Sequence, residues 1–257
     1  LLNGEFAIFA PIPYGPFENV SEHFMRPSKK HLFGTDQNGR DVFSRMLYGA
    51  RVSLAVGILA TAITFLIGTV IGLIAGYFGK SIDIILMRII EIIMCFPTFL
   101  LLLILMVIMM DRNYKQSILL VIGVIGLTSW TGLSRIVRGE VLKQREMAYI
   151  LSCKSLGLPV WRIMLFHLLP NILGPIFVTM TFGVAGAILA ESGLSFLGFG
   201  VQPPTASWGE LLREALSNPV ENWHLTLWPG LAIFLTVVSF NFVGEGLTKA
   251  FDPTRKI

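Results

Sequence analysis

The sequence predicts an all-α membrane protein, a bundle of helices that crosses the bilayer several times. Apolar residues make up 54% of the 257 residues and charged residues only 14%, whereas a soluble domain carries about 25% charged residues. The mean hydropathy is correspondingly high, at +0.71. Charged residues are also absent from long stretches of the chain, as in segments that lie in lipid. A helix suits such stretches because it satisfies its own backbone hydrogen bonds.

Five uncharged stretches define the predicted spans. A helix rises 1.5 Å per residue, so about 20 apolar residues cross the hydrocarbon core. The stretches are Val52–Gly79, Ile92–Met110, Gln116–Ser134, Leu168–Ala190 and Leu225–Gly244. The leading LLNGEFAIFAP is apolar but too short and too interrupted to span. We expect a sixth, N-terminal span to precede it.

A polar head, residues 1–51, comes before the first predicted span. Asn38-Gly39 marks a turn, and apolar residues then recur at helical spacing among charged ones. This pattern predicts an amphipathic helix at the membrane interface, with an ordinary helix that leads into the span as the alternative. We therefore divide the chain into an external head (1–51) and a transmembrane domain (52–257).

In the first predicted span, Gly68, Gly72 and Gly76 repeat every four residues. They fall on one helix face and allow another backbone to approach closely. The neighbour is expected within this chain, with a contact to another subunit as the alternative.

The second predicted span carries an ionisable pair. Arg88 and Glu91 are three residues apart, so they share a helix face and can pair. Ionisable residues inside a span are functional candidates. Pro97 is expected to kink this helix.

A basic loop, about residues 138–170, joins the third and fourth predicted spans. It follows Arg135 and contains Arg138, Lys143, Arg145, Lys154 and Arg162. The positive-inside rule therefore places it in the cytoplasm, and alternation of the spans then places the C-terminus there too. Its spacing predicts a helix from about 140 to 156 that ends at Gly157, and Pro159 forbids continuation. A second helix follows from 160 and stops at Pro170, so the loop forms a helix–turn–helix that can dock into a groove on a soluble partner.

An external loop, about residues 191–224, joins the fourth and fifth predicted spans. The stretch TASWGELLREAL predicts a short capped helix, either a lid or a re-entrant connector. Trp208, Trp223 and Trp228 suit a membrane–water interface.

The sequence offers no catalytic, metal-binding or nucleotide-binding motif. GKS at 79–81 resembles the end of a phosphate-binding loop, but Ile74 occupies the position of the required glycine. His23, His31, His167 and His224 are scattered. Cys95 and Cys153 lie in different regions, so we expect no disulfide. Apart from Arg88 and Glu91 the spans carry no charge, so we expect another protein to supply the energy for any transport.

The basic loop resembles the coupling loop of permease subunits in bacterial ABC importers. That motif reads Glu-Ala-Ala, three residues, Gly, nine residues, Ile, one residue, Leu-Pro. Gly157, Leu169 and Pro170 match in register. Leu151, Ser152 and Cys153 replace the Glu-Ala-Ala triad, and His167 replaces the Ile, so the triad itself does not match.

Further segments resemble the C-type permeases of dipeptide, oligopeptide and nickel importers, from about residue 31 to the C-terminus. They are GTDQNGRDVFSRMLYGARVSL, MRIIEIIMCFPT, HLLPN, LSFLGFGVQPPTASWG and FNFVGEGLTKAFDP. The resemblance implies six spans, cytoplasmic termini and a place in the bacterial inner membrane among lipids.

The same resemblance implies the partners: a second, similar permease, two ATPases that bind ATP and Mg, and an external substrate-binding protein, with no nucleic acid. The loop that would enter a cleft on one ATPase comprises Leu151, Ser152, Cys153, Lys154, Gly157, Leu169 and Pro170. This chain itself would bind no cofactor and catalyse no reaction.

Peptides are the predicted substrate, with nickel as the alternative within the same family. A nickel site would use imidazole with carboxylate or thiolate ligands, whereas the spans offer only Cys95, Met106, Met109, Met110 and Met180. Methionine in an apolar span is usually packing. A stand-alone carrier or channel is less favoured because the spans lack charge, and an intramembrane enzyme lacks the residues it would need.

Overall fold

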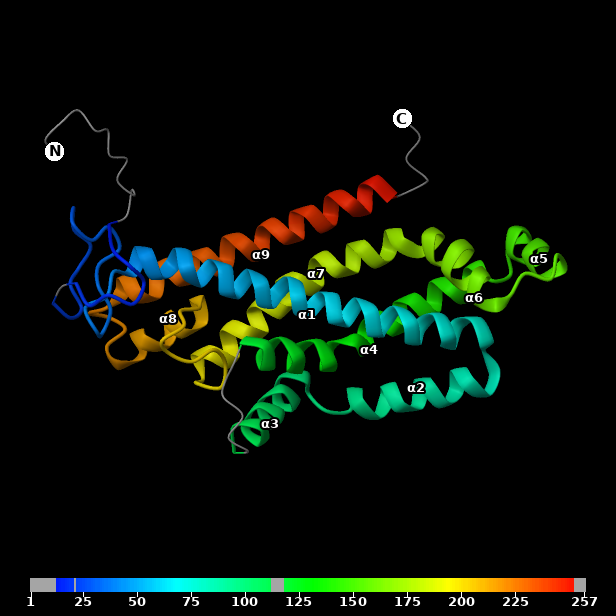
Figure 1. Cartoon of the computed structure of the whole chain (residues 1–257), viewed down its shortest axis with the longest axis horizontal. Coiled ribbons are helices and arrows are strands. Elements are labelled where there is room, and N and C mark those ends of the chain that lie inside the picture. Colours follow the sequence, from blue (N-terminus) through cyan, green and yellow to red (C-terminus); the bar gives the residue numbers. More distant parts are fainter. Residues whose placement is uncertain (1–12, 21, 112–117, 252–257) are drawn as a thin grey trace, which may run out of the picture.

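Helices build the regular structure that the computed structural model describes, which covers residues 13–20, 22–111 and 118–251 (Figure 1). In chain order they are α1 (Val42–Phe78), α2 (Lys80–Met94), α3 (Thr98–Asp111), α4 (Ile118–Gln144), α5 (Ala148–Ser155), α6 (Val160–Arg162), the π-helical turn η1 (Ile163–Leu168), α7 (Leu169–Phe196), α8 (Trp208–Glu214), the 3₁₀ turn η2 (Ala215–Ser217) and α9 (Trp223–Phe251). The predicted all-α class is confirmed.

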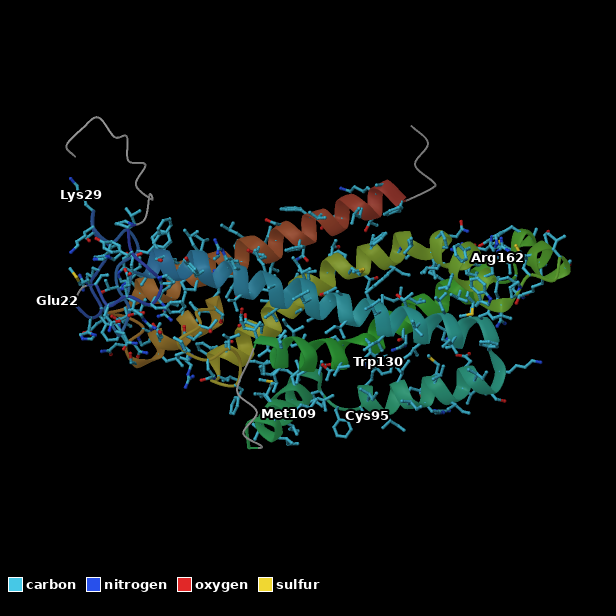
Figure 2. The ribbon with its side chains drawn as sticks, viewed as in Figure 1. Glu22, Lys29, Cys95, Met109, Trp130 and Arg162 are labelled. Atoms are coloured by element: carbon cyan, nitrogen blue, oxygen red, sulfur yellow. The ribbon has the colours of Figure 1, made fainter. Side chains whose placement is uncertain are left out.

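The long helices run along the longest axis of the molecule. α1 contacts both α4 and α7, and α7 contacts α9. Figure 1 shows α5 at one end of this axis and α8 at the other, which we call the α5 end and the α8 end. Figure 2 shows Glu22 and Lys29 at the α8 end, Arg162 at the α5 end, and Cys95, Met109 and Trp130 between them.

Four helices are long and apolar enough to cross a membrane: α1, α4, α9 and the helix that runs from Val160 to Phe196. α2 and α3 together make a fifth candidate, although they are bent by 79° at the break between them. Pro97 lies in this break, where its missing N–H and its ring interrupt a helix. The predicted kink is therefore a sharp bend, and the predicted five spans are found when the bent pair counts as one.

α1 begins at Val42, so the amphipathic stretch of the head belongs to the helix that leads into the first span, which was the alternative to a helix at the membrane interface. These residues form the first turns of one 37-residue helix, whose length is about 55 Å. Because the hydrocarbon core is roughly 30 Å thick, polar turns can project beyond it without a break in the helix. Asp41 caps this start, and its Oδ1 accepts a hydrogen bond of 2.8 Å from the Ser44 N–H.

Other boundaries differ less. α7 continues to Phe196 and α9 begins at Trp223, so the predicted loop 191–224 is shorter by several residues at its start. The predicted helix within it is confirmed as α8, where the Ser207 side chain accepts from the Glu210 N–H at 3.1 Å. The leading segment 1–11, the predicted span start at Gln116, and Arg255 and Lys256 lie outside the described residues.

The face of Gly68, Gly72 and Gly76 packs against α4, within the same chain. A Cβ at Gly72 would lie 2.6 Å from the Val137 Cβ and 2.7 Å from the Ser134 carbonyl oxygen. A Cβ at Gly68 would meet Leu133 at 3.0 Å, and one at Gly76 would meet Val141 at 2.7 Å. Leu133, Val137 and Val141 are also four residues apart, so matching ridges of the two helices interlock.

Three groups of buried apolar residues follow one another along the axis. The group at the α8 end includes Val42, Trp208 and Leu225, and the middle group includes Ala60, Leu102 and Ile125. The group at the α5 end joins α1, α4 and the α5–α7 segment, with Leu73, Leu133, Val137, Val141, Ile150, Ile163, Leu168, Ile172 and Ile176. Each end of the bundle therefore has its own core.

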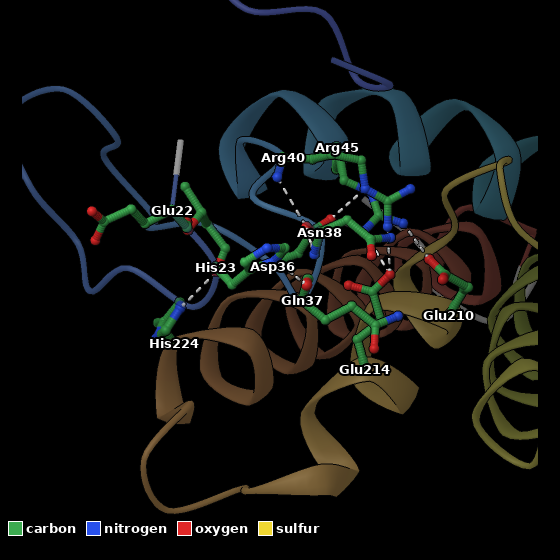
Figure 3. A network of polar contacts seen from close by, with 11 residues as sticks. Glu22, His23, Asp36, Gln37, Asn38, Arg40, Arg45, Glu210, Glu214 and His224 are labelled. Carbon is green, nitrogen blue, oxygen red and sulfur yellow. Dashed lines mark hydrogen bonds and ion pairs between the residues drawn. The ribbon is translucent and has the colours of Figure 1, made fainter. Parts of the chain in front are cut away.

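A buried ion network ties α8 to α1 and to the turn before α1 (Figure 3). Arg45 on α1 contacts Asp36, Glu210 at 2.6 Å and Glu214 at 2.7 Å. Arg40 bonds Asp36 at 2.7 Å and Glu214 at 2.9 Å. Arg45 is fully buried, and the carboxylates are nearly so. Three acids face two guanidinium groups, so the network is neutral when one carboxyl group holds a proton.

Within this network, Glu210 is the acid whose pKa departs from its ordinary value. Burial raises its pKa to about 8, although Arg45 opposes the shift and Glu214 adds to it. The folded protein therefore binds this proton more tightly than the unfolded chain. The resulting stabilisation is complete below the ordinary value of 4.5 and is lost as the pH rises through about 8.

We predict that Gly72→Val destabilises the protein by about 1–3 kcal/mol, because the added carbons have no room between α1 and α4. The control is Gly139→Ala on α4, where a Cβ would have no neighbour within 4 Å. Thermal unfolding of the purified proteins compares the two. Equal unfolding temperatures for Gly72→Val and the parent would contradict the packing.

We also predict that the free energy of unfolding falls between about pH 4.5 and about pH 8, and that Glu210→Gln removes much of this fall because the amide does not titrate. The exposed Glu221 in the same loop provides the control, since Glu221→Gln should keep the pH dependence of the parent. Denaturant titrations at several pH values measure it. If the free energy of unfolding of Glu210→Gln depended on pH as that of the parent does, Glu210 would not be the group responsible.

Candidate functional site

The loop at the α5 end is a short helix set apart from its neighbours. The helix predicted from 140 to 156 is not continuous, because α4 ends at Gln144 and α5 begins at Ala148. Arg145 lies in the break and donates from Nη1 to the Gly76 carbonyl at 3.0 Å. That carbonyl belongs to the last turn of α1, where carbonyl groups lack partners within the helix. α4 therefore ends directly before Arg145, whose side chain bonds to the end of α1.

Gly157 ends α5 as predicted, in a left-handed conformation with φ +73°. The Gly157 N–H donates to the Lys154 carbonyl at 3.0 Å and the Leu158 N–H to the Cys153 carbonyl at 3.2 Å. This pair of bonds is the Schellman arrangement that closes a helix. Pro159, with an extended backbone, then precedes α6.

Pro170 does not stop the following helix, so that part of the prediction is wrong. The chain is helical from Val160 through Phe196, and Pro170 lies in the first turn of α7. The six residues before α7 form a π-helical turn, in which the Leu169 N–H donates to the Met164 carbonyl. A wider turn relieves the clash of a proline ring with the preceding turn and accommodates the missing N–H.

α5 turns one side to the bundle and the other outward. Ile150 is fully buried in the core of the α5 end, whereas Leu151 is 48% exposed and Leu156 is 78% exposed. Ser152 and Lys154 are exposed as well, and Cys153 is half-buried. Large apolar side chains that face outward beside polar ones are typical of a contact surface.

The predicted coupling residues do not form one patch. Leu151, Ser152, Lys154 and Gly157 share the exposed end, whereas Leu169 and Pro170 lie at the base of α7. Leu169 packs against the core of the α5 end, so its role in this fold is to anchor the loop.

Two contacts connect the α5 end to α1 and α2. The Lys154 ammonium lies 5.5 Å from the centre of the Tyr77 ring on α1, a cation–π contact. Arg138 on α4 bonds Asp83 on α2 with two nitrogens, one of them at 2.6 Å. With Arg145 on Gly76, these contacts join α5 and α4 to the end of α1 and the start of α2, where the GKS residues lie.

A cavity of about 450 Å³ lies between α1, α3, α4 and α7. Its lining carries hydroxyl groups among small and apolar side chains, from Thr61, Thr64, Thr98, Ser129 and Thr179. Glycines widen it, namely Gly132, Gly183 and Gly186. It has no charged residue in its lining, so it offers weak hydrogen bonding and no fixed charge. Sequence reasoning missed this cavity, although Thr61 and Thr64 on one helix face were an available signal.

The other predicted candidates lie away from the cavity. Arg88 Nη1 is 2.8 Å from Glu91 Oε2, so their spacing does produce a pair, but the side chains are 75% and 59% exposed on α2. The face of Gly68, Gly72 and Gly76 is filled by α4, so it does not widen the cavity.

The methionines and Cys95 do not assemble a metal site. Met106 is fully buried in the middle core, Met180 lines the cavity and Cys95 is exposed. The Met110 side chain lies outside the described part of the chain. Within that part, no three His, Cys, Asp or Glu residues are grouped closely enough to hold a metal ion.

Comparisons with known proteins agree with this architecture. Residues 68–257 match the family described as "Binding-protein-dependent transport system inner membrane component". The chain is 43% identical to the dipeptide transport system permease protein DppC of Bacillus subtilis (strain 168), over 96% of this chain and 78% of that protein. It is 42% identical to the oligopeptide transport system permease protein OppC of Haemophilus influenzae, over 87% of this chain and 70% of that protein.

Solved structures support the fold. The MetNI methionine ABC transporter in an inward-facing conformation aligns with a TM-score of 0.65 at 16% identity, covering 81% of this chain and 96% of that one. An amino acid ABC transporter aligns with a TM-score of 0.62 at 16% identity, over 81% and 95% of the chains. With the family match over most of the chain, these results establish that the protein belongs to the binding-protein-dependent transport system inner membrane components, the membrane-spanning permease subunits of ABC transporters.

Proposed function

We propose that this chain is a pore-forming permease subunit of an ATP-driven importer of dipeptides and oligopeptides. The observation that carries the proposal is the pairing of an uncharged cavity inside the bundle with an outward-facing helix, α5, at one end. The cavity can pass a solute but holds no group that could react with it. Its relatives named as dipeptide and oligopeptide permeases favour peptides as that solute.

The partners follow from what the chain lacks. Of its GKS residues, Gly79 joins α1 to α2 while Lys80 and Ser81 begin α2, so ATP and Mg would be bound by partner ATPases. We propose two such subunits, a second homologous permease that completes the pore, and an external binding protein that delivers peptide. The α5 end would face the cytoplasm of a bacterial cell, because Arg138, Lys143, Arg145, Lys154 and Arg162 gather there. The C-terminus would then be cytoplasmic and the α8 end external.

Coupling would proceed from α5 to the cavity through α1. Movement of α5 in the cleft of an ATPase acts on Tyr77 through Lys154, and on the Gly76 carbonyl through the neighbouring Arg145. Both contacts lie in the last turns of α1, the helix that also carries the cavity residues Thr61 and Thr64. Interlocked packing transmits this motion because α1 and α4 move together.

A nickel importer of the same family is the second candidate. The permease need not bind the ion tightly, because an external protein can select it. The exposed Cys95 and the buried Met106 do not favour nickel, since neither is placed to coordinate an ion with other ligands. A secondary carrier that works alone has less support, because the cavity lining holds no ionisable residue.

We predict that Gly157→Val abolishes transport while the subunit still inserts. The left-handed backbone at φ +73° disfavours a β-branched residue by about 1–2 kcal/mol, and a change of conformation there misdirects α5. A Cβ at this position has no neighbour within 4 Å, so the effect isolates the backbone. Substrate-stimulated ATP hydrolysis by the reconstituted complex measures it. Gly157→Asn is the control, because asparagine tolerates this conformation, and normal stimulation in Gly157→Val would disprove the role.

We predict that peptide, and not Ni²⁺, stimulates ATP hydrolysis by the complete complex with its binding protein. Each is supplied separately to the same proteoliposomes, with neither added as the control. Stimulation by Ni²⁺ alone would overturn the choice of substrate and leave the role as a permease intact.

A further inference from the structure

Glu191 is a carboxyl group buried inside the bundle, near the end of α7 that faces the α8 end. It has no exposed surface, and it directly follows the cavity residue Ala190 and lies one helical turn beyond Ala187, toward the α8 end. It belongs neither to the ion network of Arg45 nor to the cavity lining. A buried ionisable residue in a span is costly to keep, so it calls for a specific role.

Its partners are serines from two helices. The Ser195 hydroxyl, one turn along α7, donates to Oε1 at 2.7 Å, and Ser53 Oγ on α1 lies 3.1 Å from Oε2. These serines in turn accept backbone N–H bonds, Ser195 from Val201 at 3.0 Å and Ser53 from Trp208 at 3.3 Å. The carboxyl group is therefore the centre of a hydrogen-bond chain that joins α1, α7, the loop before α8 and the start of α8.

The surroundings favour the neutral acid. Among the described residues, no Lys, Arg or His pairs with Glu191. The nearest cationic groups on the packed elements have other partners or face outward: Arg45 bonds Asp36, Glu210 and Glu214, Arg51 stacks on Tyr48, and Arg213 is exposed. An ionised carboxylate in such a place loses its hydration without gaining an opposite charge, so the group retains its proton.

The helix backbones around Glu191 are closely packed. A Cβ at Gly209 on α8 would lie 2.6 Å from the Ser192 Cα on α7, and one at Gly49 on α1 would lie 3.4 Å from the Ser207 Cα. At this spacing, water has no room to replace a lost hydrogen bond between α1, α7 and α8. An unpaired buried polar group is unfavourable, so the close packing depends on the bonds of Glu191 with the serines.

We propose that Glu191 is a positioning residue for transport: as a neutral carboxylic acid, it joins α1, α7 and α8 into one body that closes the α8 end of the cavity. The proposal rests on the proposed function for its consequence, since the closed end is where an importer would receive its solute. Opening of the cavity at this end then requires the three helices to move together, away from the partner permease, without α8 separating from α1.

The test measures whether solute-sized reagents reach the cavity from the α8 end. Cys95 and Cys153 are first replaced by serine, and Gly186→Cys then places one thiol in the cavity, at a position where a Cβ has no neighbour within 4 Å. Spheroplasts that carry the complete transporter receive a membrane-impermeant maleimide from outside. Labelling is compared among the parent, Glu191→Ala, Glu191→Gln, Ser53→Ala and, as the control, Glu221→Gln.

We expect Glu191→Ala to be labelled roughly fivefold faster or more, because the serines lose their shared partner. Glu191→Gln should stay protected, since its amide can accept from Ser195 and donate to Ser53 as the neutral acid does. Ser53→Ala, which keeps the Ser195 bond, should fall between them, and it decides the matter if Glu191→Ala fails to insert. Protection in both Glu191→Ala and Ser53→Ala, or labelling of Glu191→Gln as fast as Glu191→Ala, would overturn the proposal.

An infrared measurement tests the protonation state independently. Glu210 also contributes to the band of protonated carboxylic acids, so that band should lose only the contribution of Glu191 in Glu191→Gln and keep it in Glu221→Gln. An unchanged band in Glu191→Gln would refute the neutral form. Neither experiment needs a substrate. Failure of peptide to stimulate ATP hydrolysis would therefore reject the proposed function without affecting these results.

Discussion

The close approach of α1 and α4 is the constraint on which the rest of the structure depends. In lipid the helices gain little from hiding apolar surface, so association relies on contact between backbones and small side chains. Gly68, Gly72 and Gly76 provide that contact against Leu133, Val137 and Val141. It sets the spacing of two cavity walls, and it brings Arg145 to the end of α1. The loop of α5 is held in place by the same helix pair.

The general architecture followed from the sequence because its causes are local. Lipid excludes charge along a whole span, so runs without charge mark the helices directly. The end of α5 at Gly157 could be predicted equally well, since a left-handed glycine followed closely by a proline ends a helix through local geometry alone. The capped helix α8 was predicted for the same reason, through the Ser207 side chain and the Glu210 N–H.

The parts that could not be predicted depend on distant partners. Arg40 and Glu214 are 174 positions apart, and their ion pair forms only once α8 folds back beside α1. The cavity likewise requires α1, α3, α4 and α7 together, and the contacts of Glu191 require α1, α7 and the start of α8. Local rules failed at two further places. Pro170 does not end the helix, because the π-helical turn before it accommodates the proline. α4 ends at Gln144, next to the contact of Arg145 with Gly76, which the sequence does not reveal.

The unbroken length of α1 has a mechanical consequence. It joins the ion network at one end of the bundle to the Lys154 and Arg145 contacts at the other, through 37 residues without a proline. A rod of about 55 Å that tilts by about 5° displaces its far end by about 5 Å, nearly the pitch of one helical turn. α1 can therefore act as a lever, in which a small rotation at the α5 end becomes a displacement as wide as a side chain at the α8 end.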